Sequence, residues 1–159
     1  MAANHFIVPT LPVGKVIAVR LGQGSADKYS DLDSGKIVKL TAESRYELAV
    51  AGDPIEGVIV QVETGTSGGY TIGGVMTGQD NGFFFATADG LQATPGVGTI
   101  AIGDLVVAGS ITAKGTALAA YPKVCKATSQ TLVRHAWRVV SLGPVGTGAV
   151  GTRLCLEKL

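Results

Sequence analysis

The sequence predicts an all-β protein with one domain, and three observations support this. Glycine makes up 23 of 159 residues, well above its usual share of about 7%, and valine, alanine, leucine and isoleucine dominate the apolar residues. No stretch shows a helical hydrophobic period. Turn-forming residues recur roughly every 8–12 positions, a spacing typical of sandwiches and barrels. We therefore expect a β-barrel or β-sandwich over residues 15–159, preceded by an extended N-terminal arm over residues 1–14.

The arm is predicted from Pro9 and Pro12, because proline favours extended backbone and blocks a helix. A strand is expected at 15–20, followed by a polar, glycine-containing loop over 22–35. A second strand is expected at 36–40. Residues 42–48 are the best local candidate for a helix, although a segment this short is not stable alone.

The rest of the chain alternates between turns and short apolar runs. Gly52-Asp-Pro predicts a turn, and Gly103-Asp104 opens a similar valine-rich run, but this similarity is too short to predict a repeat. Another short apolar run follows Gly115. Strands are expected at 56–62, 70–76, 83–85, 105–107, 123–127, 137–142 and 153–157.

The charges are few and unevenly distributed along the chain. Charged residues make up 16% of the sequence, and this low share indicates that neighbours cover part of the surface. Residues 1–113 carry 6 basic and 11 acidic side chains, whereas residues 114–159 carry 7 basic side chains and a single acidic one, Glu157. Such a dipolar chain suits complementary contacts between subunits. The alternative is that these charges only solvate outward faces.

The beginning of the sequence does not have the pattern of a secretory signal, and no stretch approaches the roughly 18 apolar residues of a membrane span. We expect a protein made and kept in a cytosol-like compartment, with no membrane partner. Cys125 and Cys155 are then expected to be reduced strand residues, and they would pair only if their strands are neighbours. Two cysteines this far apart do not make a metal site.

The sharpest catalytic match is Gly65-Thr-Ser67-Gly-Gly69, which fits G-x-S-x-G. An aspartate (Asp80, Asp89 or Asp104) and then His135 follow Ser67 in an order that permits a hydrolase triad. That motif needs a strand-to-helix turn, whereas the residues after it favour a strand. We therefore interpret the motif as a hairpin turn and expect no enzyme, and a small serine hydrolase using Ser67 is the less favoured alternative.

Other ligand patterns are incomplete. Gly96-Val-Gly98 lacks the helix that a dinucleotide site needs, and Gly35-Lys36 lacks the rest of a P-loop, so no cofactor is predicted. His5 and His135 are isolated in sequence. The acidic residues Asp27, Asp31 and Asp33 share a loop, but the glycine and distal glutamate of an EF-hand are missing, so a solvated acidic loop without a metal is expected.

Nucleic acid is not a predicted partner, although basic residues with interleaved aromatics can bind single strands. Trp137, the only tryptophan, begins an apolar run and is expected in the core or an interface. Phe83, Phe84 and Phe85 must point to both faces of a strand, so either both faces are covered or one is buried in a partner. We favour the partner. The basic residues are Lys123, Lys126, Arg134 and Arg138, and the candidate interface residues are Phe6, Ile7, Val8, Phe83, Phe84, Phe85 and Trp137.

Four stretches resemble the decoration (cement) proteins of tailed-bacteriophage heads. They are Asp33-Ser-Gly-Lys-Ile-Val-Lys-Leu40, Gly52-Asp-Pro-Ile-Glu-Gly-Val58, Ile102-Gly-Asp-Leu-Val-Val107, and the closing segment from Trp137-Arg-Val-Val-Ser-Leu142 through Gly151 to Leu156. They consist of glycine and valine patterns around turns.

The resemblance implies a viral structural protein that binds the outer surface of an assembled phage capsid and cements neighbouring major capsid subunits. It also implies a homo-oligomer, dimeric or trimeric, located on the capsid exterior of the virion and made in the host cytoplasm. The alternatives are a carbohydrate-binding or adhesin β-module and a tail component of a virion.

Overall fold

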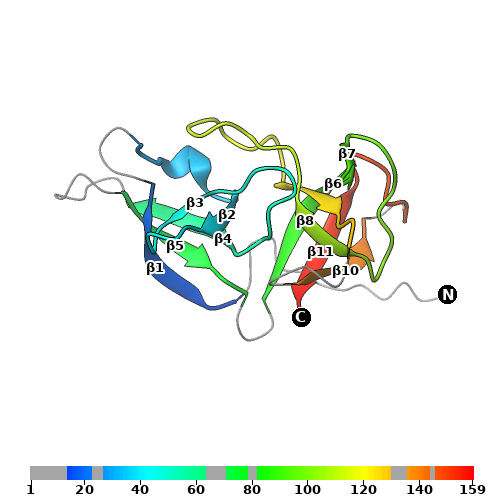
Figure 1. Ribbon diagram of the computed structural model, residues 1–159, viewed down its shortest axis with the longest axis horizontal. Coiled ribbons are helices and arrows are strands. Elements are labelled where there is room, and N and C mark those ends of the chain that lie inside the picture. The colour runs from blue at the N-terminus through cyan, green and yellow to red at the C-terminus, as the bar shows by residue number, and fades with distance from the viewer. Residues whose placement is uncertain (1–13, 23–26, 64–70, 79–81, 130–135, 144–145) are drawn as a thin grey trace.

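Figure 1 shows the computed structural model, which describes residues 14–22, 27–63, 71–78, 82–129, 136–143 and 146–159. Its regular structure is almost entirely β-strand, which confirms the all-β prediction. The elements are β1 Val16–Leu21, the short 3-10 helix η1 Asp31–Asp33, β2 Ile37–Leu40, β3 Tyr46–Leu48, β4 Gly57–Glu63, β5 Thr71–Met76, β6 Phe83–Leu91, β7 Thr94–Pro95, β8 Leu105–Ala108, β9 Lys123–Lys126, β10 Trp137–Leu142 and β11 Arg153–Lys158.

The first half of the chain closes into a barrel with the strand order β1-β3-β2-β4-β5. The β1 strand pairs with β5 along its whole length, from Val16 opposite Met76 to Leu21 opposite Thr71. On its other side β1 meets β3 at one position, where Leu21 pairs with Tyr46. The barrel interior is filled by the buried apolar side chains Leu21, Tyr29, Val38, Tyr46, Ile59, Val62 and Val75.

The second half forms a six-stranded sheet in the order β11-β10-β8-β9-β6-β7, and β11 also pairs with β6. The β11–β6 pairing closes β11, β10, β8, β9 and β6 into a second ring of strands. The short strand β7 pairs with β6 and lies outside this ring. The first ring lies at the left of Figure 1 and the second at the right. The predicted barrel is therefore two small barrels in tandem, a division that no linker marks in the sequence.

One apolar core joins the two barrels. Val58 and Met76 of the first barrel belong to the same buried cluster as Phe84 and Trp137 of the second. Polar bonds cross the same boundary: the Trp137 indole N–H donates to the carbonyl oxygen of Ile55 at 3.0 Å. Because such a core and its bonds would be exposed by separating the halves, the barrels form one packed body.

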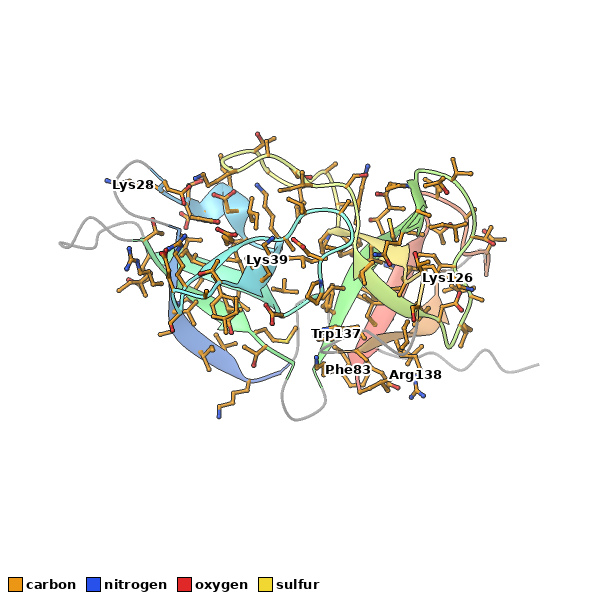
Figure 2. The ribbon with its side chains drawn as sticks, in the orientation of Figure 1. Lys28, Lys39, Phe83, Lys126, Trp137 and Arg138 are labelled. Atoms are coloured by element: carbon orange, nitrogen blue, oxygen red, sulfur yellow. The ribbon has the colours of Figure 1, made fainter. Side chains whose placement is uncertain are left out.

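Each barrel contains the same turn, and the Gly-Asp pairs of the sequence form it. Gly52 and Gly103 both have φ of 91°, which glycine adopts without the strain that a β-carbon would cause. The following aspartates each accept a hydrogen bond at 2.8 Å from the backbone N–H three residues earlier. A lysine of another strand pairs with each aspartate, Lys39 of β2 with Asp53 at 2.7 Å and Lys126 of β9 with Asp104 at 3.0 Å. Both lysines are labelled in Figure 2.

The helix expected at 42–48 is wrong. Residues 46–48 form β3, which pairs antiparallel with β2 to make a hairpin. Ser44 occupies the left-handed region at φ 56°, and the Thr41 N–H donates to the Arg45 carbonyl across the loop at 2.8 Å. Burial of Tyr46 in the barrel interior outweighs a helix that has too few residues to be stable alone.

One other expectation about a strand is corrected, and one apolar run is now placed. The strand predicted at 83–85 continues to Leu91, because the Ala86 and Ala88 side chains extend the buried face of β6. The apolar run after Gly115 forms no strand, and residues 109–122 are a long connection between β8 and β9. In Figure 1 this yellow-green connection reaches from the second barrel over the first.

Candidate functional site: an apolar groove between the barrels

A groove of about 370 Å³ lies where the two barrels meet. Its walls come from η1 and β4 of the first barrel, from β6 of the second, and from residues 117–122 of the β8–β9 connection. Aliphatic and aromatic side chains dominate the lining, and among the described residues that line it only Asp31 is charged. This volume falls in the range of about 300–1,000 Å³ that is common for ligand sites.

Two aromatic rings from opposite walls meet in the groove. The ring of Phe85 on β6 lies 5.3 Å from the ring of Tyr121, centre to centre, at an interplanar angle of 54°. The Arg153 guanidinium carbon lies 4.9 Å from the centre of the Phe85 ring, a cation–π arrangement that also stabilises this ring. Phe85 and Tyr121 are both partly exposed, so their rings remain available to an apolar ligand.

The wall formed by residues 117–122 is held in place by a buried ion pair in the first barrel. The Lys36 ammonium lies 2.6 Å from the Asp33 carboxylate and donates to the Ala113 carbonyl oxygen at 2.7 Å. The Gly115 N–H donates to the same carboxylate at 2.8 Å. A second ion pair, Lys114 with Asp27, lies nearby. These contacts fasten the connection from the second barrel onto the first.

The environment of Asp33 keeps its carboxylate charged. Burial alone would raise the pKa of Asp33, but hydrogen bonds from Lys36, Ser30 and Gly115 together outweigh it and lower the pKa below its usual value. The prediction of a solvated acidic loop is therefore wrong for Asp33, whose side chain is 0% exposed. Its partner Lys36 was assigned to a strand, and no ion pair was predicted for it.

The predicted interface residues separate into three groups. Phe84 and Trp137 are 2% and 0% exposed, and their rings form an edge-to-face pair at 4.8 Å inside the core. The interface prediction is corrected for Phe84, because alternate residues of β6 face the interior of the chain's own barrel. Trp137, on β10, lies in the core, the other place that was expected for it. Phe83 and Phe85 are partly exposed, and their partner role stays a prediction. The residues Phe6, Ile7 and Val8 lie outside the described part of the chain.

The predicted catalytic and metal candidates do not come together in the described residues. Ser67, Asp80, His5 and His135 all lie outside them. Asp89 and Asp104 have other partners in the structure. The Asp89 carboxylate accepts a hydrogen bond from the Ser110 hydroxyl at 2.6 Å, and Asp104 forms an ion pair with Lys126. Within the ranges that the structure covers, no group of three or more His, Cys, Asp or Glu side chains is placed to hold a metal ion.

The two cysteines are buried and unpaired with each other, as free thiols. Burial, together with the nearby Asp89 carboxylate, raises the pKa of Cys125 to about 11. Burial also raises the pKa of Cys155. Since the thiolate is the reactive form, neither thiol is poised as a nucleophile at neutral pH.

Several basic residues of the C-terminal third have acidic partners within the chain. Lys126 pairs with Asp104, and Arg138 donates to Glu157 at 3.0 Å. Lys123 lies 3.9 Å from Asp89. The uneven charge along the sequence is thus partly neutralised by folding, since acidic side chains from the first part of the chain meet basic ones from the last.

Among the described residues, no helix is long and apolar enough to cross a membrane. A comparison with protein-family models finds no match to this chain, and a comparison with curated protein sequences finds none either. The site is therefore interpreted from its own geometry, an apolar groove lined by two aromatic side chains.

Proposed function

We propose that this chain is a viral structural protein that binds the outer surface of a phage capsid and cements neighbouring major capsid subunits. The four stretches that resemble decoration proteins support the proposal. They lie at the two matching turns, at the ion-paired segment 33–40 and at the β10–β11 pair, which all belong to the framework of the fold.

The observation that carries the proposal is the open edge of β1. This strand is paired fully with β5 but meets β3 only at Leu21, so no described strand lies beside Val16–Val19 on that side. An open strand edge presents backbone N–H and C=O groups that an extended segment of another protein can pair with. Val16 is 48% exposed there, and the exposed Ala18 lies two residues along the same face.

A cement protein must also transmit force between the subunits it joins, and the packing of this chain suits that task. The shared core and the ion-paired connection hold the two barrels together, so a load applied at one barrel reaches the other without a hinge. Each contact with the shell needs only moderate strength, because a homo-oligomer that touches several shell subunits gains avidity.

The first experiment measures the copy number of this chain in purified particles by quantitative mass spectrometry. We expect hundreds of copies in a simple ratio to the major shell protein. The second measures co-sedimentation of the purified chain with shells that lack it. Replacing Ala18 by Lys places a charge on the open edge and is expected to weaken binding by tenfold or more, an estimate based on how lysine blocks edge pairing.

The matched control is Val97→Lys, at a 63% exposed valine in the connection that follows β7 of the second barrel. We expect this variant to bind shells as the unmodified chain does. If Ala18→Lys and Val97→Lys bind shells equally well, the β1 edge is not part of the interface. A handful of copies per particle, or no binding of the unmodified chain to shells, would discard the cement function.

A further inference from the structure

The groove between the barrels has the chemistry of a site for an extended, proline-containing peptide. Phe85 and Tyr121 form an aromatic pair at 5.3 Å, and Leu118 and Pro122 add apolar surface beside them. Aromatic-lined grooves recognise P-x-x-P segments, because the polyproline conformation is already extended and loses little entropy on docking.

The chain itself supplies such a segment immediately before the first described residue. Pro9-Thr-Leu-Pro12 is a P-x-x-P sequence, and residues 1–13 contain no acidic and no lysine or arginine side chain. Among the described residues of the groove lining, the only charged one is the exposed Asp31, a carboxylate. An arm without acidic residues therefore meets no like charge there.

The position of Gly14 places this segment within reach of the groove. A β-carbon at Gly14 would lie 3.2 Å from the Cα of Gly82, the residue before β6 begins. Phe85 is three residues further along, about 10 Å at the usual rise of a strand. At about 3.1 Å per residue counted back from Gly14, the chain is long enough for Pro12 to lie about 6 Å away and Pro9 about 16 Å away, distances that span the path to the aromatic pair.

We propose that Pro9–Pro12 docks in the groove of its own chain, against Phe85 and Tyr121. The groove then fixes the base of the arm across the boundary between the barrels, and Phe6, Ile7 and Val8 extend beyond it toward a partner. This inference does not depend on the capsid function, since it concerns a contact within one chain.

The test uses the full chain with the photocrosslinking residue p-benzoylphenylalanine in place of Leu11. After irradiation, we expect crosslinks from position 11 to residues 84–85 or 117–122. An equal mixture of isotopically light and heavy chains identifies the source, and crosslinks within one chain are expected at every protein concentration. Tyr121→Ala should lower the yield between about twofold and tenfold, the range for losing one aromatic contact.

The matched control carries the same photocrosslinker at Leu40, which is 48% exposed on β2, and is expected to give no groove crosslink. Double replacement of Pro9 and Pro12 by Ser should also lower the yield from position 11, without affecting the fold of the barrels. Mixed light–heavy products at about half of all crosslinks, the share that random pairing between chains gives, would overturn docking within one chain. Crosslinks that avoid both groove segments, or that ignore Tyr121→Ala, would overturn the groove as the binding site.

Discussion

Replacing Lys36 by Met tests whether the buried ion pair fastens the β8–β9 connection. The Lys36 and Asp33 side chains are 4% and 0% exposed, and the ammonium serves both the carboxylate and the Ala113 carbonyl. Methionine keeps much of the volume but leaves the carboxylate without its cation. Breaking a buried pair in this way costs about 3–5 kcal/mol. Two backbone donors, from Ser30 and Gly115, still reach Asp33, so we expect the lower end of that range.

The assay is urea unfolding of the full chain at neutral pH, for Lys36→Met, Asp33→Asn and the double variant. Because the two groups contact each other directly, the double variant should cost less than the sum of the single ones by roughly 1–3 kcal/mol. Hydrogen exchange gives a local measure, and the Gly115 amide should exchange faster in Lys36→Met. A cost below about 1 kcal/mol with additive single effects would refute the idea that the pair anchors the connection.

The same pair predicts how stability depends on pH. The pKa of Asp33 is lower in the folded chain than in the unfolded chain, where it is about 3.9. The unfolded state therefore binds the proton first as the pH falls, and the stability from Asp33 is present above that value and lost as the pH falls through the folded pKa. The unmodified chain should thus lose more stability below about pH 4 than Asp33→Asn does.

Three further outcomes are expected. Phe84→Asp should unfold the chain or lower its stability by at least about 3 kcal/mol in urea unfolding, because it places a carboxylate beside Trp137 in the core. A stable, soluble variant would contradict the burial of Phe84. Lys158→Met should raise the free energy of unfolding by about 1–3 kcal/mol at pH 7, because burial lowers the pKa of Lys158 to about 8. This gain should fade between about pH 8 and 10.4, as the lysine loses its proton first in the folded and then in the unfolded state. Cys125 should resist iodoacetamide at pH 8 until the chain is unfolded, and rapid labelling of the native protein would refute its raised pKa.

Much of the strand pattern was predictable because local signals determine it. The Gly-Asp turns are an example: a left-handed glycine followed by an aspartate that bonds back to the turn needs only four consecutive residues. The helix prediction for residues 42–48 failed because local signals did not determine their structure. Their local preference was weak, and the burial of Tyr46 in the barrel, a contact between distant parts of the chain, determined the structure.

The groove was not predictable, because its residues come from widely separated segments with no shared pattern. Tyr121 belongs to a connection that carries no periodic signal, and it meets Phe85 where that connection, bonded to the Asp33–Lys36 pair, passes over the first barrel. Asp33-Ser-Gly-Lys36 contained a local clue, since opposite charges three residues apart can meet in a turn. Nothing in the sequence indicated that the pair would be buried.

The three consecutive phenylalanines show how the two kinds of information combine. Alternation along a strand requires Phe83 and Phe85 to face opposite to Phe84, so the sequence correctly indicated that both faces of β6 need cover. The core covers Phe84, and Tyr121 with Arg153 covers part of Phe85. Phe85 lines the groove, about 10 Å along β6 from Gly82, the residue that lies beside Gly14. If the proposed docking holds, the aromatic pair and the uncharged proline-containing segment are complementary parts of one chain, and the two faces of β6 have separate roles, one in stability and one in recognition.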